Sequence, residues 1–295
     1  MVEHAPHEKN LGWEYVYNEN NIDPVLGDQF LSEAYYRADD DYQGRTTVPA
    51  LIDTTTGKVV NNDYNWLTTY FEVNFRPWHK KGAPELYPVE LREEIDKMNL
   101  WLFDNINNAV YRSSFSRSNE GHFDGVNTFY AAMDRLEKRL ETNRFLFGDY
   151  VTDSDIRLYV TLARLDIRYT AQLGETKRPL YTYKNLWGYA KELWEIPAFA
   201  HHTDFAAIIR QGRIEGEEDG FRASTHYDLA LPKIDWDAQW KVSTERAYLS
   251  SDPTHPIYLG NNRRFDIDPT WYDLGAESPK KEEKETPPSC GCCCG

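Results

Sequence analysis

The order of the expected elements is the feature that most restricts the fold of this chain. A β-branched, apolar run at residues 46–53 predicts a strand, and a second short strand follows a Thr-rich turn at residues 58–60. Short helices are expected on either side, at residues 30–37 and 64–73. Every strong pattern after these is helical. The order therefore predicts an α+β fold, with a small strand-containing part first and helices after it.

Four longer helices are expected beyond the proline-rich stretch that ends at Pro88. Apolar residues recur every three or four positions over 91–106 and again over 126–140, which is typical of amphipathic helices. A third helix begins at Thr152, because Thr152 and Asp155 have the spacing of a capping box. Its predicted inner face consists of Ile156, Val160, Ala163 and Ile167. The fourth covers residues 186–193.

Composition restricts the class of protein. The chain has 295 residues, of which 40% are hydrophobic and 14% aromatic, so it can bury a sizeable core. Its formal net charge of -15 repels a phosphate backbone, and we expect no nucleic-acid partner. No run approaches the roughly 18 apolar residues that a membrane span needs.

The cysteines are confined to the end of the chain. Cys290, Cys292, Cys293 and Cys294 lie within the last six residues, and the 289 residues before them contain none. A body without cysteines fits a reducing compartment, so the expected localisation is cytoplasmic. The adjacent thiols follow a Pro-Pro-Ser hinge and suit lipidation, which would attach the protein peripherally to a membrane. Soft-metal binding and unmodified thiols remain the alternatives.

Six segments carry a family resemblance in both order and spacing. They are Ile22–Gly27, Ala38–Arg45, Thr47–Pro49, Asp104–Tyr111, Asp155–Leu158 and Asn185–Tyr189. These segments resemble the glutathione transferases, most closely the Xi-class glutathionyl-hydroquinone reductases, over about residues 13–210. The resemblance implies a thioredoxin-like part followed by an all-α glutathione-transferase C-terminal domain.

The resemblance also implies a division of the chain. We expect a partial thioredoxin-like domain over residues 1–85 and the helical domain over 86–212. An extended wrap over 213–276 and a flexible tail over 277–295 would follow. In the family, a strand and a helix with a Cys-Pro motif precede the segment that starts here near Trp13. Twelve residues are too few for that unit, so a truncated thioredoxin-like half without the catalytic cysteine is expected.

The resemblance places glutathione against the N-terminal part. Val48-Pro49 matches the family's cis-proline step, whose main chain pairs with the cysteine part of glutathione. The alternative is a trans proline that ends a strand. Asp63-Tyr64 stands where the family has a Glu-Ser pair that holds the γ-glutamyl group. Val48, Pro49 and Asp63 are therefore the expected glutathione-binding residues.

Tyr111 and Tyr169 match tyrosines that line the family's electrophile pocket, where a phenol can donate a hydrogen bond to a quinone oxygen. The alternative is that both are ordinary aromatic core residues. A small aromatic ligand is the expected partner of this pair. No metal site and no catalytic residue are expected.

Two functions remain open. One is a glutathione transferase-like protein of the Xi or omega type that lacks thiol-dependent catalysis. The other is a non-catalytic scaffold or ligand-binding protein, in which the helical domain binds a protein partner and the lipidated tail binds a membrane.

Overall fold

The computed structural model describes residues 3–4, 12–15, 18–80, 82–174, 178–210, 235–251, 257 and 259–260. The predicted flexible tail (277–295) lies outside these residues, and so do its cysteines, Cys290, Cys292, Cys293 and Cys294. Their lipidation therefore stays a prediction. Within the described ranges, no helix combines the length and the apolar character that a bilayer crossing requires.

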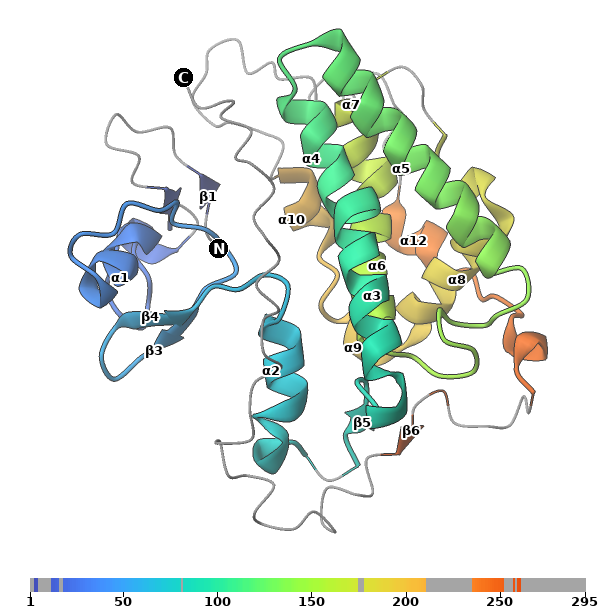
Figure 1. Cartoon of the computed structure of the whole chain (residues 1–295), viewed down its shortest axis with the longest axis horizontal. Helices are drawn as coiled ribbons and strands as arrows, with labels where there is room; N and C mark the ends of the chain where they lie inside the picture. Colours follow the sequence, from blue (N-terminus) through green and yellow to red (C-terminus); the bar gives the residue numbers. More distant parts are fainter. Residues whose placement is uncertain are drawn as a thin grey trace.

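The N-terminal part is a small unit of short strands and one helix. Strand β1 (Glu3–His4) pairs with β2 (Trp13–Glu14), and β3 (Leu51–Asp53) pairs with β4 (Lys58–Asn61), both antiparallel. Helix α1 (Leu31–Ala38) packs against β4 (Figure 1). A two-stranded hairpin is marginal in water, so the buried face of α1 stabilises this unit.

The sequence predicted these elements well except at one strand. The helix expected at 30–37 and the second strand are confirmed to within a residue. The first strand begins at Leu51 and not at residue 46, because the chain before it forms a loop around Pro49, which has no N–H to donate. Helix α2 (Leu67–Val73) begins three residues later than expected, after a turn at Asp63.

The second part is a bundle of helices, shown in green and yellow in Figure 1. Its helices are α3 (Arg92–Leu102), α4 (Asn108–Phe115), α5 (Asn119–Arg139), α6 (Asp153–Arg164), α7 (Thr170–Gln172), α8 (Lys184–Glu195), α9 (Pro197–Ala200) and α10 (Phe205–Arg210). Two π-helical turns interrupt them: η4 (Phe103–Asn107) between α3 and α4, and η5 (Leu165–Tyr169) between α6 and α7.

Short elements connect the rest. Strands β5 (Pro84–Glu85) and β6 (Leu259–Gly260) pair antiparallel. The 3-10 turns are η1 (Glu19–Asn21), η2 (Arg76–Trp78), η3 (Val89–Leu91), η6 (Leu180–Thr182) and η7 (Ala247–Leu249). With the small sheets and the bundle together, the expected α+β fold is confirmed: a thioredoxin-like N-terminal part precedes an all-α domain.

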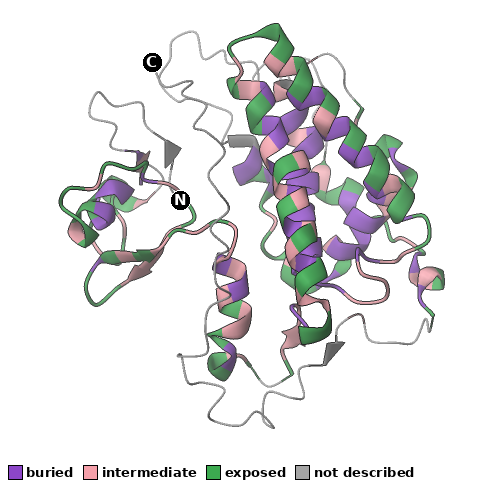
Figure 2. Cartoon of the chain, viewed as in Figure 1, coloured by how far each residue is buried: buried purple, intermediate pink, exposed green. Residues whose placement is uncertain are grey.

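The core lies between the helices, where their purple inner faces meet in Figure 2. The predicted stripes of α3 and α5 are buried: Leu102, Ile106 and Met133 have no exposed surface. The predicted inner face of α6 is correct at Ala163, which is buried, but wrong at Val160. Leu158 and Leu162 are fully buried, whereas Val160 is 38% exposed.

The periodicity of α6 gave the wrong orientation because neighbouring elements cover this helix on almost every side. It packs against both α3 and α8, so polar residues that should mark an outer face are buried too. Arg157 is one of them: its Nε lies 2.8 Å from Oδ2 of Asp153, and its Nη2 donates to the carbonyl of Asn65. Periodicity fails when partnered polar side chains line a buried helix.

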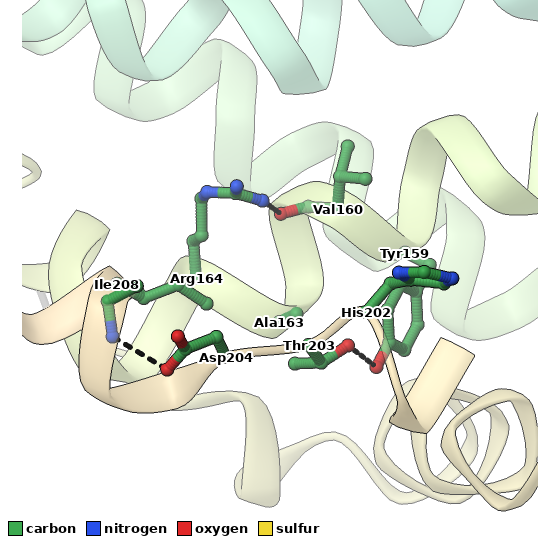
Figure 3. A pocket seen from close by; sticks show the side chains of 9 residues that line it. Tyr159, Val160, Ala163, Arg164, His202, Thr203, Asp204 and Ile208 are labelled. Atoms are coloured by element: carbon green, nitrogen blue, oxygen red, sulfur yellow. Dashed lines mark hydrogen bonds between the residues drawn. The ribbon is translucent and has the colours of Figure 1, made fainter. Parts of the chain in front are cut away.

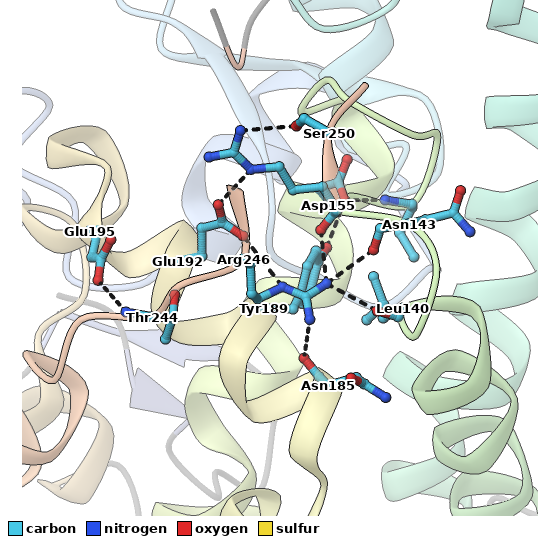
Figure 4. Close-up of polar contacts among 12 residues, drawn as sticks. Leu140, Asn143, Asp155, Asn185, Tyr189, Glu192, Glu195, Thr244, Arg246 and Ser250 are labelled. Carbon is cyan, nitrogen blue, oxygen red and sulfur yellow. Dashed lines mark hydrogen bonds and ion pairs between the residues drawn. The ribbon is translucent and has the colours of Figure 1, made fainter. Parts of the chain in front are cut away.

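The segment predicted as an extended wrap contributes to the core where it is described. Helix α12 (Trp236–Trp240) places the buried Trp240 against Trp187 and Tyr159, with ring centroids 5.2 and 6.0 Å away. Further along, Arg246 enters the bundle and reaches carbonyl groups at the end of α5 (Figure 4). The wrap is therefore anchored at two points.

One half-buried carboxyl gives stability a pH dependence. Burial, together with the negative charges of Asp153 and Glu85, raises the pKa of Glu72 on α2 to about 7. The native state holds a proton that the unfolded chain releases near its ordinary pKa, so this contribution is present at low pH and is lost as the pH rises through 7. We expect the melting temperature to fall between pH 6 and pH 8.

Glu72→Gln is expected to remove much of that fall and to stabilise the protein at pH 8 by about 1 kcal/mol. Glu94→Gln, at an exposed position on α3, is the control because it changes the net charge equally. Melting curves at the two pH values check this. An equal response of both variants would show that net charge, and not Glu72, sets the pH dependence.

Candidate functional site

The loop before β3 exposes the main chain at the predicted proline step. The Val48–Pro49 peptide bond is cis, as the family resemblance implied. The Val48 side chain is 44% exposed, and no described residue hydrogen-bonds to the Val48 main chain. The Tyr35 hydroxyl donates to the neighbouring Thr47 carbonyl at 2.7 Å, which fixes the loop on α1. The N–H and C=O of Val48 are thus available to an extended ligand.

Asp63 lies directly before the turn that leads into α2. Its Oδ1 accepts a hydrogen bond from the Asn65 amide at 3.1 Å, and its own amide donates to Oδ1 of Asn61 at 2.8 Å. Its Oδ2 has no partner in the part of the chain that the structure describes. The carboxylate therefore stabilises the turn before α2 and retains one oxygen for an ammonium or amide group of a ligand.

Tyr64 connects the N-terminal part with the bundle. Its ring lies 5.3 Å from that of Phe103 in η4 and stays 42% exposed. Burial of the hydroxyl raises the pKa of Tyr64, the nearby Arg157 lowers it, and the nearby Tyr111 raises it. Position 64 is thus close to the predicted aromatic pocket, which the sequence alone did not reveal.

The predicted pocket tyrosines lie together. The hydroxyl oxygens of Tyr111 on α4 and Tyr169 at the end of η5 are 3.1 Å apart, and their rings meet edge to face. Tyr111 is 41% exposed, whereas Tyr169 is buried. Burial, followed by the neighbouring Tyr111, raises the pKa of the Tyr169 hydroxyl. The buried phenol therefore stays protonated and orients the exposed one.

Both tyrosines lie next to a π-helical turn. Such turns widen a helix locally and often occur at functional sites. Here η5 ends at Tyr169 and η4 ends directly before α4, the helix of Tyr111. No sequence pattern indicated these turns, because a π turn lacks a distinctive residue signature.

Arg157 connects the segment after Asp63 to helix α6. Its Nη2 donates to the Asn65 carbonyl at 2.8 Å, just after Asp63 in the chain, while its Nε pairs with Asp153. Asn99 of α3 donates to the same Asp153 oxygen at 2.8 Å. A buried, partnered guanidinium therefore joins the start of α2 to α6.

A cavity of about 220 Å³ lies beside α6 (Figure 3). Its walls are Tyr159, Val160, Ala163, Arg164, His202, Thr203, Asp204, Ala207 and Ile208. The Tyr159 hydroxyl and the Thr203 hydroxyl are 2.8 Å apart at its edge. None of the predicted site residues lines this cavity, so it is distinct from the tyrosine pair. Among the described residues, no three His, Cys, Asp or Glu side chains gather in a way that could hold a metal ion.

The residues present fit glutathione at two points. The free Val48 main chain matches an extended peptide, and Asp63 offers an oxygen to its α-ammonium group. The small hydroxyl expected beside this carboxylate is absent, since Tyr64 fills that position with a phenol. When bound, glutathione would supply a thiol. The chain would supply the Val48 main chain, the Asp63 carboxylate and the phenol of Tyr64.

Comparisons with known proteins identify the family of this chain. Residues 109–192 match the model of the glutathione S-transferase C-terminal domain. The chain is 35% identical over 208 residues to glutathione S-transferase omega-like 2 of Schizosaccharomyces pombe, covering 67% of this chain and 66% of that protein. It is 33% identical over 186 residues to the glutathionyl-hydroquinone reductase YqjG of Escherichia coli, covering 63% of this chain and 56% of that one. The chain thus spans less than two thirds of these curated relatives.

Solved structures give the same result. A glutathione transferase from Gordonia bronchialis is 32% identical, with a TM-score of 0.72 and coverage of 83% of this chain and 74% of that chain. The Xi 1 glutathione transferase of Trametes versicolor is 32% identical, with a TM-score of 0.64 and coverage of 71% and 73%. The chain belongs to the glutathione transferases, and its relatives include Xi-class members and glutathionyl-hydroquinone reductases.

Proposed function

We propose that this protein binds glutathione at Val48, Pro49 and Asp63, and a small aromatic ligand beside Tyr111 and Tyr169, without thiol-dependent catalysis by its own cysteines. The observation that carries the proposal is the exposed loop at Val48, whose main chain has no hydrogen-bond partner among the described residues. The structure of YqjG, 31% identical over a shared fold, was solved with glutathione bound, which supports the choice of ligand.

The proposed arrangement gives each group one task. The Val48 N–H and C=O bind the peptide part of glutathione, and the Asp63 carboxylate binds its ammonium group. The exposed Tyr111 hydroxyl, held by Tyr169 at 3.1 Å, donates to an oxygen of the aromatic ligand. A neutral phenol suits this role, because it can donate only while protonated.

Glutathione is expected to raise the melting temperature of the full chain. A ligand at ten times its dissociation constant stabilises the folded state by about 1.4 kcal/mol, which corresponds to roughly 3 °C for a chain of this size. Asp63→Ala should remove the shift. Asp63→Asn should weaken it strongly while keeping an oxygen for the Asn65 amide, so it separates ligand binding from the stability of the turn before α2.

The matched control is Asp40→Ala, an exposed carboxylate in the loop after α1. It should leave the glutathione shift intact. A wild-type melting curve that does not respond to 10 mM glutathione would reject the proposal and favour a scaffold.

The second test concerns the thiol. Residues 1–289 contain no cysteine, so the full chain with all four tail cysteines replaced by serine carries no nucleophilic sulfur. We expect neither this variant nor the wild type to reduce a glutathionyl-hydroquinone above the uncatalysed rate. Turnover by the wild type that is lost in the variant would assign the reaction to the tail, and turnover by both would require another catalytic group.

A further inference from the structure

Helix α4 carries two exposed aromatic rings on one side. Tyr111 and Phe115 both belong to this helix and lie one turn apart, so their side chains project from the same face. The centroids of the two rings are 6.1 Å apart, and the ring planes differ by only 21°. The rings of Tyr111 and Phe115 therefore form one continuous aromatic surface.

Phe115 is the more exposed member of this pair. It is 77% exposed, and no large hydrophobic residue in the described ranges is more exposed. A single exposed hydrophobic residue on a protein surface is ordinary. Phe115 is not isolated, however, because its ring continues that of Tyr111, a residue of the candidate site. Phe115 thus extends the site by one turn along α4.

The opposite side of α4 is fixed against α5, which runs beside it (Figure 1). Ser113 lies between the two aromatic residues in the sequence and is buried, with its hydroxyl oxygen 2.9 Å from Nδ1 of His122 on α5. Gly125 of α5 approaches so closely that a Cβ atom there would lie 2.7 Å from the Ser113 nitrogen. Because α4 is held in this way, both rings are oriented before a ligand binds, which lowers the entropic cost of binding.

The aromatic surface has one polar position. The Tyr111 ring meets the ring of the buried Tyr169 edge to face, with centroids 6.0 Å apart, and the two hydroxyl oxygens are 3.1 Å apart. Phe115 has no polar side-chain atom and offers only its ring. A ligand that fits both residues needs an oxygen for the Tyr111 hydroxyl and a flat apolar area for Phe115.

The separation of the two rings sets the number of rings in the ligand. A single ring held at the Tyr111 hydroxyl stacks fully on only one side chain, because the centroids of Tyr111 and Phe115 are 6.1 Å apart. Two fused rings extend further and contact both side chains at once. Removal of the exposed Phe115 ring from water then adds to the affinity.

We propose that Phe115 is a ligand-binding residue and that it gives the site a preference for flat, fused-ring aromatic ligands with an oxygen substituent. This inference rests on the proposed function and adds the ring class of the second ligand. An aromatic contact strengthens binding by roughly two- to tenfold beyond the effect of the buried area. Phe115 is therefore expected to decide between one ring and two.

Calorimetric titration of the full chain with 2-naphthol and with phenol is the test. The two probes carry the same hydroxyl group and differ by one fused ring, and the wild type should bind 2-naphthol more tightly. Phe115→Ala should weaken binding of 2-naphthol roughly tenfold and binding of phenol less than about twofold. Phe115→Tyr keeps a ring and should retain the wild-type affinity for 2-naphthol. Tyr111→Phe removes the hydroxyl donor and should weaken binding of both probes.

Trp78→Ala is the matched control. Trp78 in η2 is 76% exposed and also lies beside an exposed ring, that of Phe75, with centroids 5.8 Å apart. This variant should leave both affinities unchanged. An equal loss of 2-naphthol affinity in Trp78→Ala would show that the probe stacks on any exposed ring, and it would overturn the inference. The Phe115 variants should keep the wild-type melting temperature, because the residue is exposed.

An unchanged ratio of the two affinities in Phe115→Ala would also overturn the inference. The glutathione shift, which depends on Asp63, is measured on the same samples. Normal phenol binding and a normal glutathione shift, with the ratio unchanged, overturn the role of Phe115 alone. If neither probe binds, the proposed aromatic site beside Tyr111 and Tyr169 is wrong as well.

Discussion

Replacing Asp155 by alanine is expected to lower the free energy of unfolding by about 4 kcal/mol, the largest effect of any single substitution considered. This carboxylate is fully buried, and four donors converge on it. Oδ1 accepts from the Leu146 amide at 2.9 Å and the Tyr189 hydroxyl at 2.7 Å. Oδ2 accepts from the amide and hydroxyl of Thr152 at 2.8 and 2.9 Å. Burial raises the pKa of Asp155, while these hydrogen bonds lower it.

Alanine at position 155 would leave these buried donors without an acceptor and remove the cap of α6 at the same time. Ser118→Ala is the matched control: Ser118 also caps a helix, α5, but its bond to the Gly121 amide is exposed. That change should cost only about 1 kcal/mol. Urea unfolding measures both. Similar losses for the two variants would show that capping alone, and not the buried network, gives Asp155 its effect.

Replacing Arg246 by methionine is expected to destabilise the protein by about 3 kcal/mol. Its guanidinium joins the C-terminal segment to the bundle (Figure 4). It donates to the carbonyls of Leu140, Asn143, Arg144 and Asn185 at 3.0–3.3 Å. Its Nε lies 3.4 Å from Oε2 of Glu192, which also pairs with Arg144. Methionine fills similar space but satisfies none of these acceptors.

Arg178→Met is the matched control for Arg246. Arg178 pairs with Asp134, and both of these side chains are about half exposed, so the loss should stay below about 1 kcal/mol. Limited proteolysis adds a local measurement: Arg246→Met should make cleavage within residues 235–251 faster, while Arg178→Met should not. Equal unfolding free energies for the two variants would contradict the anchoring role of Arg246.

The sequence predicted features whose cause is local. The capping box at Thr152 and Asp155 is present, because its spacing by itself places both side chains across one helical turn. The stripes of α3 and α5 were correct, because these helices bury one face. The family resemblance predicted the cis Val48–Pro49 bond and assigned Tyr111 and Tyr169 to one pocket. In the structure the bond is cis and the two tyrosines are in contact.

The features that the sequence missed depend on contacts distant in the chain. Arg157 and Arg246 are buried only because acceptors more than 60 residues away surround them, which no periodicity reports. The predicted inner face of α6 was wrong at Val160 for the same reason.

A glutathione titration that is monitored through the NMR resonances of the backbone amides tests the central claim most directly, because it locates the bound ligand. We expect the largest shifts at the Val48 amide and around Asp63 and Asn65, with smaller shifts at Tyr64. The Asp63→Asn variant should need a much higher glutathione concentration for the same shifts. Shifts confined to the cavity beside α6 or to the cysteine tail, or none at all, would contradict glutathione binding at the Val48–Pro49 step.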